Sequence, residues 1–113
     1  MSIMEKARSL GEAILESTEY RALKEAEAAI YNNEEAKNLL NELNAKQRQI
    51  EIAQANGKQL NQKQQKEIQN LQTKMQNNKI VKSFMDAQQN FNKVMQTVNQ
   101  TISGVLGNNQ ENN

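Results

Sequence analysis

The sequence lacks two residue types on which many kinds of chemistry depend. It has no cysteine, so it cannot form a disulfide framework, and no histidine, the usual base of nucleophilic catalysis. The common thiolate and imidazole ligands of zinc, haem and iron–sulfur clusters are therefore missing. Glu12 and Glu16 share one helix face, as a pair of metal ligands would, but surface pairing explains them more simply. We predict no cofactor, no metal site and no enzymatic activity.

The residues that sheets and tight turns require are also scarce. Proline is absent, and the 113 residues include four glycines, two tyrosines, two phenylalanines and no tryptophan. Because strands favour β-branched and aromatic residues and their turns favour Gly and Pro, this composition argues against a β fold. Good helix formers are abundant instead. The composition predicts an all-α protein.

Long hydrophobic runs are missing as well. No apolar stretch approaches the roughly 18–20 residues of a membrane span, and the first residues do not resemble a signal peptide. We therefore predict a cytoplasmic protein without membrane insertion.

Apolar residues recur with helical spacing along most of the chain. Asn33 followed by two glutamates is typical of a helix start, Ser17 or Thr18 is a second candidate cap, and Asn56-Gly57 is typical of a helix end. We predict a single helical domain over residues 1–106, followed by a polar tail at 107–113. Its expected helices cover about 2–15, 18–32, 33–55, 60–76 and 78–106.

The last predicted helix carries the most regular apolar pattern. Its steps of three and four, from Ile80 to Val105, are typical of a coiled-coil seam. Residues flanking the seam widen it, so one short hairpin cannot cover it. We predict a long antiparallel helical hairpin or bundle with coiled-coil-like packing that forms a homodimer or higher oligomer. The predicted oligomer interface consists of Phe84, Ala87, Phe91, Val94, Val98 and Ile102.

Charge is distributed unevenly. Residues 1–45 hold nine acids and five bases, whereas residues 46–113 hold four acids and nine bases. Pairing of these halves within the fold is the simplest use of this difference. Nucleic-acid binding by the hairpin arm is the alternative, although the bases are spaced out among Gln and Asn. Its candidate contacts are Lys58, Lys63, Lys66 and Lys74.

An ordered set of segments over roughly residues 5–102 resembles the YlbF/YmcA/YheA family of small helical regulators from Gram-positive bacteria. The matching segments are Ser17-Thr18-Glu19-Tyr20, Ala22-Leu23-Lys24-Glu25-Ala26, residues 33–40, the Gln-rich approach to Gly57, Asn78-Lys79-Ile80-Val81, residues 84–89 and residues 98–102. The YheA-like branch is one candidate position within this family.

The resemblance implies long antiparallel helices that self-associate and a non-enzymatic role. Family members act in competence, sporulation and biofilm development, in complexes that influence messenger RNA processing by a membrane-anchored endoribonuclease. The expected partners are therefore the chain itself, paralogous family members and an endoribonuclease complex. Some members carry C-terminal cysteines linked to iron–sulfur binding, and this chain has none.

The leading hypothesis is a regulatory protein–protein interaction module. The alternatives are direct nucleic-acid binding and a secreted helical hairpin of the WXG type, although the turn here is Asn-Gly and no Trp-x-Gly is present.

Overall fold

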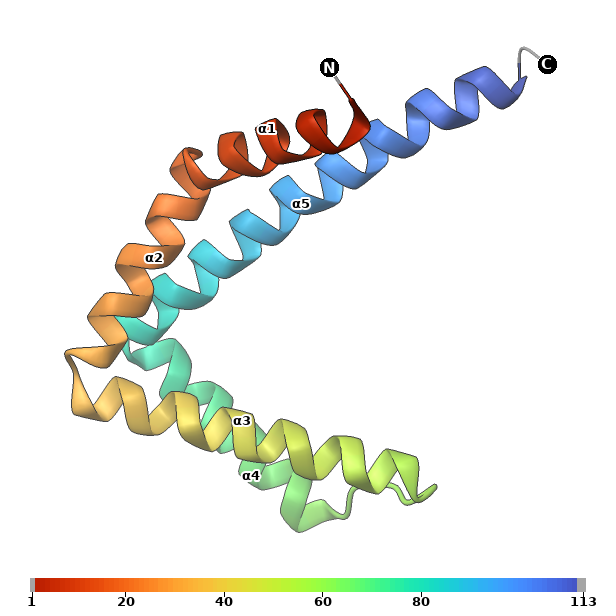
Figure 1. Ribbon diagram of the computed structural model, residues 1–113. Coiled ribbons are helices and arrows are strands. Elements are labelled where there is room, and N and C mark those ends of the chain that lie inside the picture. Colours follow the sequence, from red (N-terminus) through yellow and green to blue (C-terminus); the bar gives the residue numbers. More distant parts are fainter. Residues whose placement is uncertain (1, 112–113) are drawn as a thin grey trace. The chain divides into compact units, whose positions relative to one another are not determined.

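Helices account for nearly all of the chain that the structure describes. The computed structural model describes residues 2–111, with side chains as far as Gly107, and this part contains five helices and no strand (Figure 1). The all-α prediction is confirmed. The helices are α1 (Ile3–Leu15), α2 (Thr18–Tyr31), α3 (Glu34–Ala55), α4 (Gln62–Asn77) and α5 (Lys79–Glu111).

Each helix start is marked by a short polar side chain. The first backbone N–H groups of a helix have no partner within the helix, and a side-chain oxygen just before them accepts one of these bonds. At Asn61 the arrangement is reciprocal, because Gln64 also accepts from the backbone of Asn61. The five accepting residues are Ser2, Ser17, Asn33, Asn61 and Asn78. Of the two predicted candidates near residue 17, Ser17 is the cap.

Gly57 ends α3 in the predicted way. Its φ of 70° lies in the left-handed region that other residues adopt with difficulty. The N–H of Gly57 donates to the carbonyl of Gln54, and that of Lys58 donates to the carbonyl of Ala53. These are the two bonds of a Schellman motif. They close the helix before the chain turns into α4, which contacts α3.

The predicted end of the last helix is wrong by five residues. We expected the helix to stop at 106, with a polar tail from 107, but α5 continues to Glu111. Neither Gly104 nor Gly107 has a positive φ. A glycine inside a helix costs only about 1 kcal/mol relative to alanine, so without a left-handed turn it does not end the helix. Residues 112 and 113 of the predicted tail lie outside the described residues.

The chain divides into two compact units. Unit 1 consists of the residues up to Glu25 and those from Asp86 onward, and unit 2 consists of Ala26–Met85. The single domain expected over residues 1–106 stays a prediction, as do coiled-coil packing and self-association.

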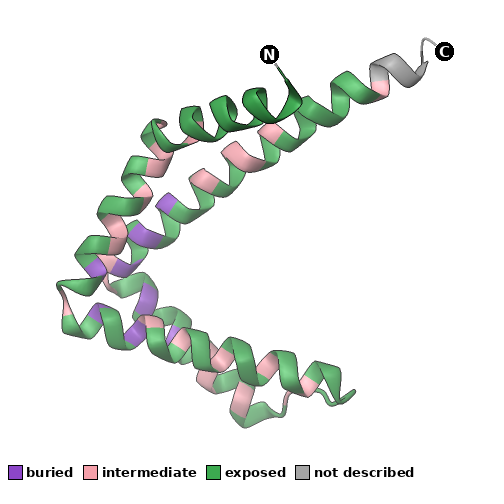
Figure 2. Cartoon of the chain, in the orientation of Figure 1, coloured by how far each residue is buried: buried purple, intermediate pink, exposed green. Residues whose placement is uncertain are grey.

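Unit 2 holds almost all of the buried hydrophobic residues (Figure 2). Val81 is fully buried, and Ala36 of α3 has no exposed surface. These positions follow the helical spacing seen in the sequence, because residues three or four apart lie on the same helix face. The buried residues of unit 2 are Ile30, Ala36, Leu39, Leu71, Met75, Val81 and Phe84.

The cap at Asn33 allows a direct test of how the chain sets its helix boundaries. The N–H of Ala36 donates to Asn33 Oδ1 over 2.9 Å. Replacement of Asn33 by alanine removes this acceptor, and we expect the free energy of unfolding to fall by about 1 kcal/mol. Urea denaturation followed by circular dichroism measures the change. The matched control is Asn38→Ala on the exposed side of α3, where alanine's higher helix propensity should keep or raise stability.

Candidate functional site

The apolar stripe of α5 is covered to different extents along its length. Phe84 and Ala87 are buried within the chain, and Ile102 is 48% exposed. The other predicted interface residues, Phe91, Val94 and Val98, are half-buried. The six therefore do not form one uniformly exposed face, and their role in self-association stays a prediction.

Phe91 takes part in an aromatic contact that the sequence pattern did not reveal. Its ring centroid lies 5.6 Å from that of Tyr20 on α2, with the planes tilted by 57°. Lys24 Nζ lies 5.4 Å from the centroid of the Tyr20 ring. Tilted aromatic pairs and cation–π contacts are both favourable. They connect the first half of α2 to the middle of α5 inside unit 1.

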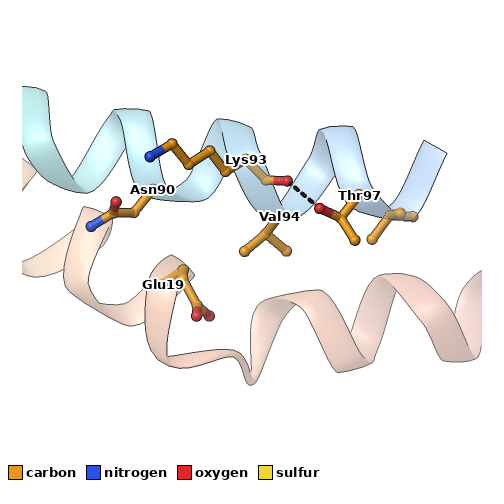
Figure 3. Close-up of a pocket in the computed structure, with 6 residues that line it drawn as sticks. Glu19, Asn90, Lys93, Val94 and Thr97 are labelled. Carbon is orange, nitrogen blue, oxygen red and sulfur yellow. Dashed lines mark hydrogen bonds between the residues drawn. The ribbon is translucent and has the colours of Figure 1, made fainter. Parts of the chain in front are cut away.

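A surface hollow of about 450 Å³ lies beside this contact (Figure 3). Its polar groups are a carboxylate from Glu19 on α2, the amide of Asn90 and the amine of Lys93 on α5, and the Thr97 hydroxyl. That hydroxyl donates to the backbone carbonyl of Lys93 over 2.9 Å, so its proton is already used (Figure 3). A single carboxylate offers neither a carboxylate pair nor an activated nucleophile. The hollow carries no recognisable catalytic arrangement, and Val94 and Val98 give it an apolar floor.

Metal and membrane sites were searched for in the same way. Within the described part of the chain, no group of three or more potential metal ligands from His, Cys, Asp and Glu comes together. Over that part, none of the helices combines the length and apolar content needed to cross a membrane.

The predicted nucleic-acid contacts belong to unit 2 and point to solvent. Lys58 lies in the turn after α3, and Lys63, Lys66 and Lys74 lie on α4. All four side chains are exposed. The structure therefore places them on one hairpin without showing whether anything binds them.

An ion pair between α3 and α4 was not predicted from the sequence. Lys46 donates to Glu67, which is 21 positions away along the chain. The hydrogen bond from Lys46 lowers the pKa of Glu67, the charge of Lys46 lowers it further, and the charge of Lys63 adds a smaller decrease. Both partners come from the net-basic segment 46–113, so this pair does not use the charge difference between the two halves.

The family model described as "Control of competence regulator ComK, YlbF/YmcA" matches residues 3–106. The chain belongs to this family. The predicted resemblance is confirmed, and the description gives the family a regulatory role in place of a reaction.

Relatives of similar length support the same assignment. The chain is similar to a UPF0342 protein of Staphylococcus saprophyticus, 29% identical over 102 residues that cover 90% of both chains. A UPF0342 protein of Desulfitobacterium hafniense is 28% identical over 106 residues, covering 94% of this chain and 81% of the relative. A UPF0342 protein of Staphylococcus aureus is 29% identical and covers 90% of each chain. Their printed names assign no biochemical activity.

The Glu67 carboxylate gives a testable pH dependence. Its pKa in the folded chain lies below the ordinary value of 4.5, so its contribution to stability is present above that value. The contribution is lost as the pH falls through the lowered folded-state pKa. We expect Lys46→Gln to raise the Glu67 pKa back toward 4.5 and Lys63→Gln to raise it less. A carboxyl-carbon NMR titration measures both shifts. Equal shifts in the two variants would contradict the assigned order of causes.

Proposed function

We propose that this chain is a non-enzymatic regulatory adaptor that acts by binding other proteins in a cytoplasmic complex. Family membership over residues 3–106 supports the regulatory part of the proposal. The absence of histidine and cysteine from the sequence supports a role without catalysis. By family resemblance, the proposed partners are copies of the chain itself, paralogous family members and an endoribonuclease complex.

The observation that carries the proposal is the exposure of large apolar side chains on a mostly polar protein. Hydrophobic residues make up only 36% of the sequence, yet several of the largest are more than half exposed. Scattered apolar residues are common on protein surfaces, but groups of them on amphipathic helices are typical of contacts with partner proteins. The residues concerned are Ile3, Met4, Leu15, Tyr31, Ile52, Val105 and Leu106.

Crosslinked capture from the native host tests the adaptor role. The tagged chain should recover paralogous family members and an endoribonuclease, in amounts well above those from an untagged strain. The measurement is quantitative mass spectrometry of the crosslinked material. Recovery of the chain alone, under conditions in which its own copies crosslink, would contradict the adaptor proposal.

One observation favours direct nucleic-acid binding as a second candidate function. Six lysines and a single acid, Glu67, occur between residues 58 and 82, and Glu67 is already paired with Lys46. The four predicted lysines therefore face solvent with little neighbouring negative charge. Such a surface attracts phosphates through charge alone, and binding releases counterions from the nucleic acid.

Salt-dependent binding of single-stranded RNA tests this candidate. Fluorescence anisotropy should show affinity that falls steeply between low and physiological salt. Combined replacement of Lys63, Lys66 and Lys74 by glutamine should reduce the logarithmic salt slope by about 2, since each contact contributes about 0.7. The control replaces Lys6 and Arg8 by glutamine in the net-acidic half and should leave the slope unchanged. No binding at low salt would eliminate the candidate.

A further inference from the structure

Unit 1 has almost no hydrophobic core of its own. Among its residues with described burial, 2–25 and 86–107, only Ala87 is buried. Yet both of its long helices carry apolar stripes. Helices in water are stabilised mainly by packing of such a face against a neighbour. Unit 1 therefore presents apolar faces that the chain itself leaves largely uncovered.

On α5 the uncovered face continues a covered one. Phe91, Val94 and Val98 are half-buried, and the same stripe reaches Ile102 and Val105 by further steps of four and three. Residues at these steps lie on one helix face. Ile102 is 48% exposed and Val105 is 58% exposed. The apolar pattern thus extends beyond the point where this chain supplies neighbours for it.

The same is true of α1, which belongs to the same compact unit as this part of α5 (Figure 1). Ile3, Ala7, Leu10 and Ile14 follow steps of four, three and four, which place them on one face. Ile14 is half-buried, but no residue of α1 is buried and Ile3 is 82% exposed. An amphipathic helix with its apolar face open to water requires a covering partner.

The uncovered area is large enough for a stable interface. The large apolar residues of the two faces leave on the order of 800 Å² uncovered, about what one partner contributes to a standard interface. For the rest of this subsection these residues are called the bare face. They are Ile3, Met4, Leu10, Leu15, Ile102, Val105 and Leu106.

The charges around the bare face favour an identical partner. No charged residue occurs on α5 from Val94 to Gln110, and α1 carries two acids and two bases. Two copies can therefore meet without like-charge repulsion, whereas a strongly charged partner would gain nothing there. The lengths also match: α1 is about 20 Å long, and α5 from Phe91 to Leu106 is about 24 Å long.

We propose that a second copy of this chain covers the bare face, so that α1 and the C-terminal part of α5 from each copy form one four-helix core. The contact is isologous, because the same face serves both copies. The inference rests on the proposed protein-contact function and names its first partner. It moves the main contact from the centre of the α5 stripe, which the chain already covers in part, to α1 and the end of α5.

Sedimentation velocity on the full chain tests the proposal. The wild-type protein should sediment with twice the 12.9 kDa mass of one chain at micromolar concentrations. Val105→Lys and Ile3→Asp, made singly, should each raise the dimer dissociation constant at least tenfold, because each buries a charge in the contact. Both should keep their helical circular dichroism signal, since the residues are exposed in the single chain and the new charges suit the nearby helix ends.

The matched control is Ile52→Lys in unit 2. Ile52 is 56% exposed against 58% for Val105, and both lie near the C-terminal end of a helix. The control should leave the dissociation constant unchanged. A monomeric wild-type chain, or a dimer weakened equally by Val105→Lys and Ile52→Lys, would overturn the proposal. So would a dimer that neither Val105→Lys nor Ile3→Asp weakens. If the chain is monomeric but still captures paralogues, this inference fails while the adaptor function stands.

Discussion

Burial of narrow apolar stripes is the interaction on which this structure depends. Hydrophobic residues make up 36% of the chain, and among residues 2–107 only eight of them are buried. Helices need less apolar surface than a compact globule, because they can share a seam. The same economy has a cost, since seven of the buried residues lie in unit 2 and unit 1 is left dependent on additional contacts.

Local signals in the sequence predicted the helix boundaries well wherever a backbone group needed a partner. Asn33, Ser17 and Gly57 all mark boundaries because their chemistry acts within three or four residues. The end of α5 was misplaced because Gly107 was read as a stop, although a glycine ends a helix only when it adopts the left-handed conformation. The division into two units depends on contacts between distant segments, which local spacing does not encode.

The candidate surfaces were predictable only in part for the same reason. Helical spacing identified the stripe of α5, but it could not show that Phe84 is buried while Val105 is exposed. Spacing says which face of a helix is apolar and not which stretch of that face has a neighbour. The Tyr20–Phe91 contact and the Lys46–Glu67 pair join positions 71 and 21 residues apart, so no local pattern indicates either.

The helix caps have a consequence for how the protein responds to acid. All five are Ser or Asn, whose oxygens neither gain nor lose a proton in the acid range. An aspartate cap would weaken on protonation, because it loses the charge that strengthens its bond to the backbone. In this chain the places where one helix stops and the next begins are therefore set by neutral groups. Acidification alters its surface charge while the helix boundaries stay where they are.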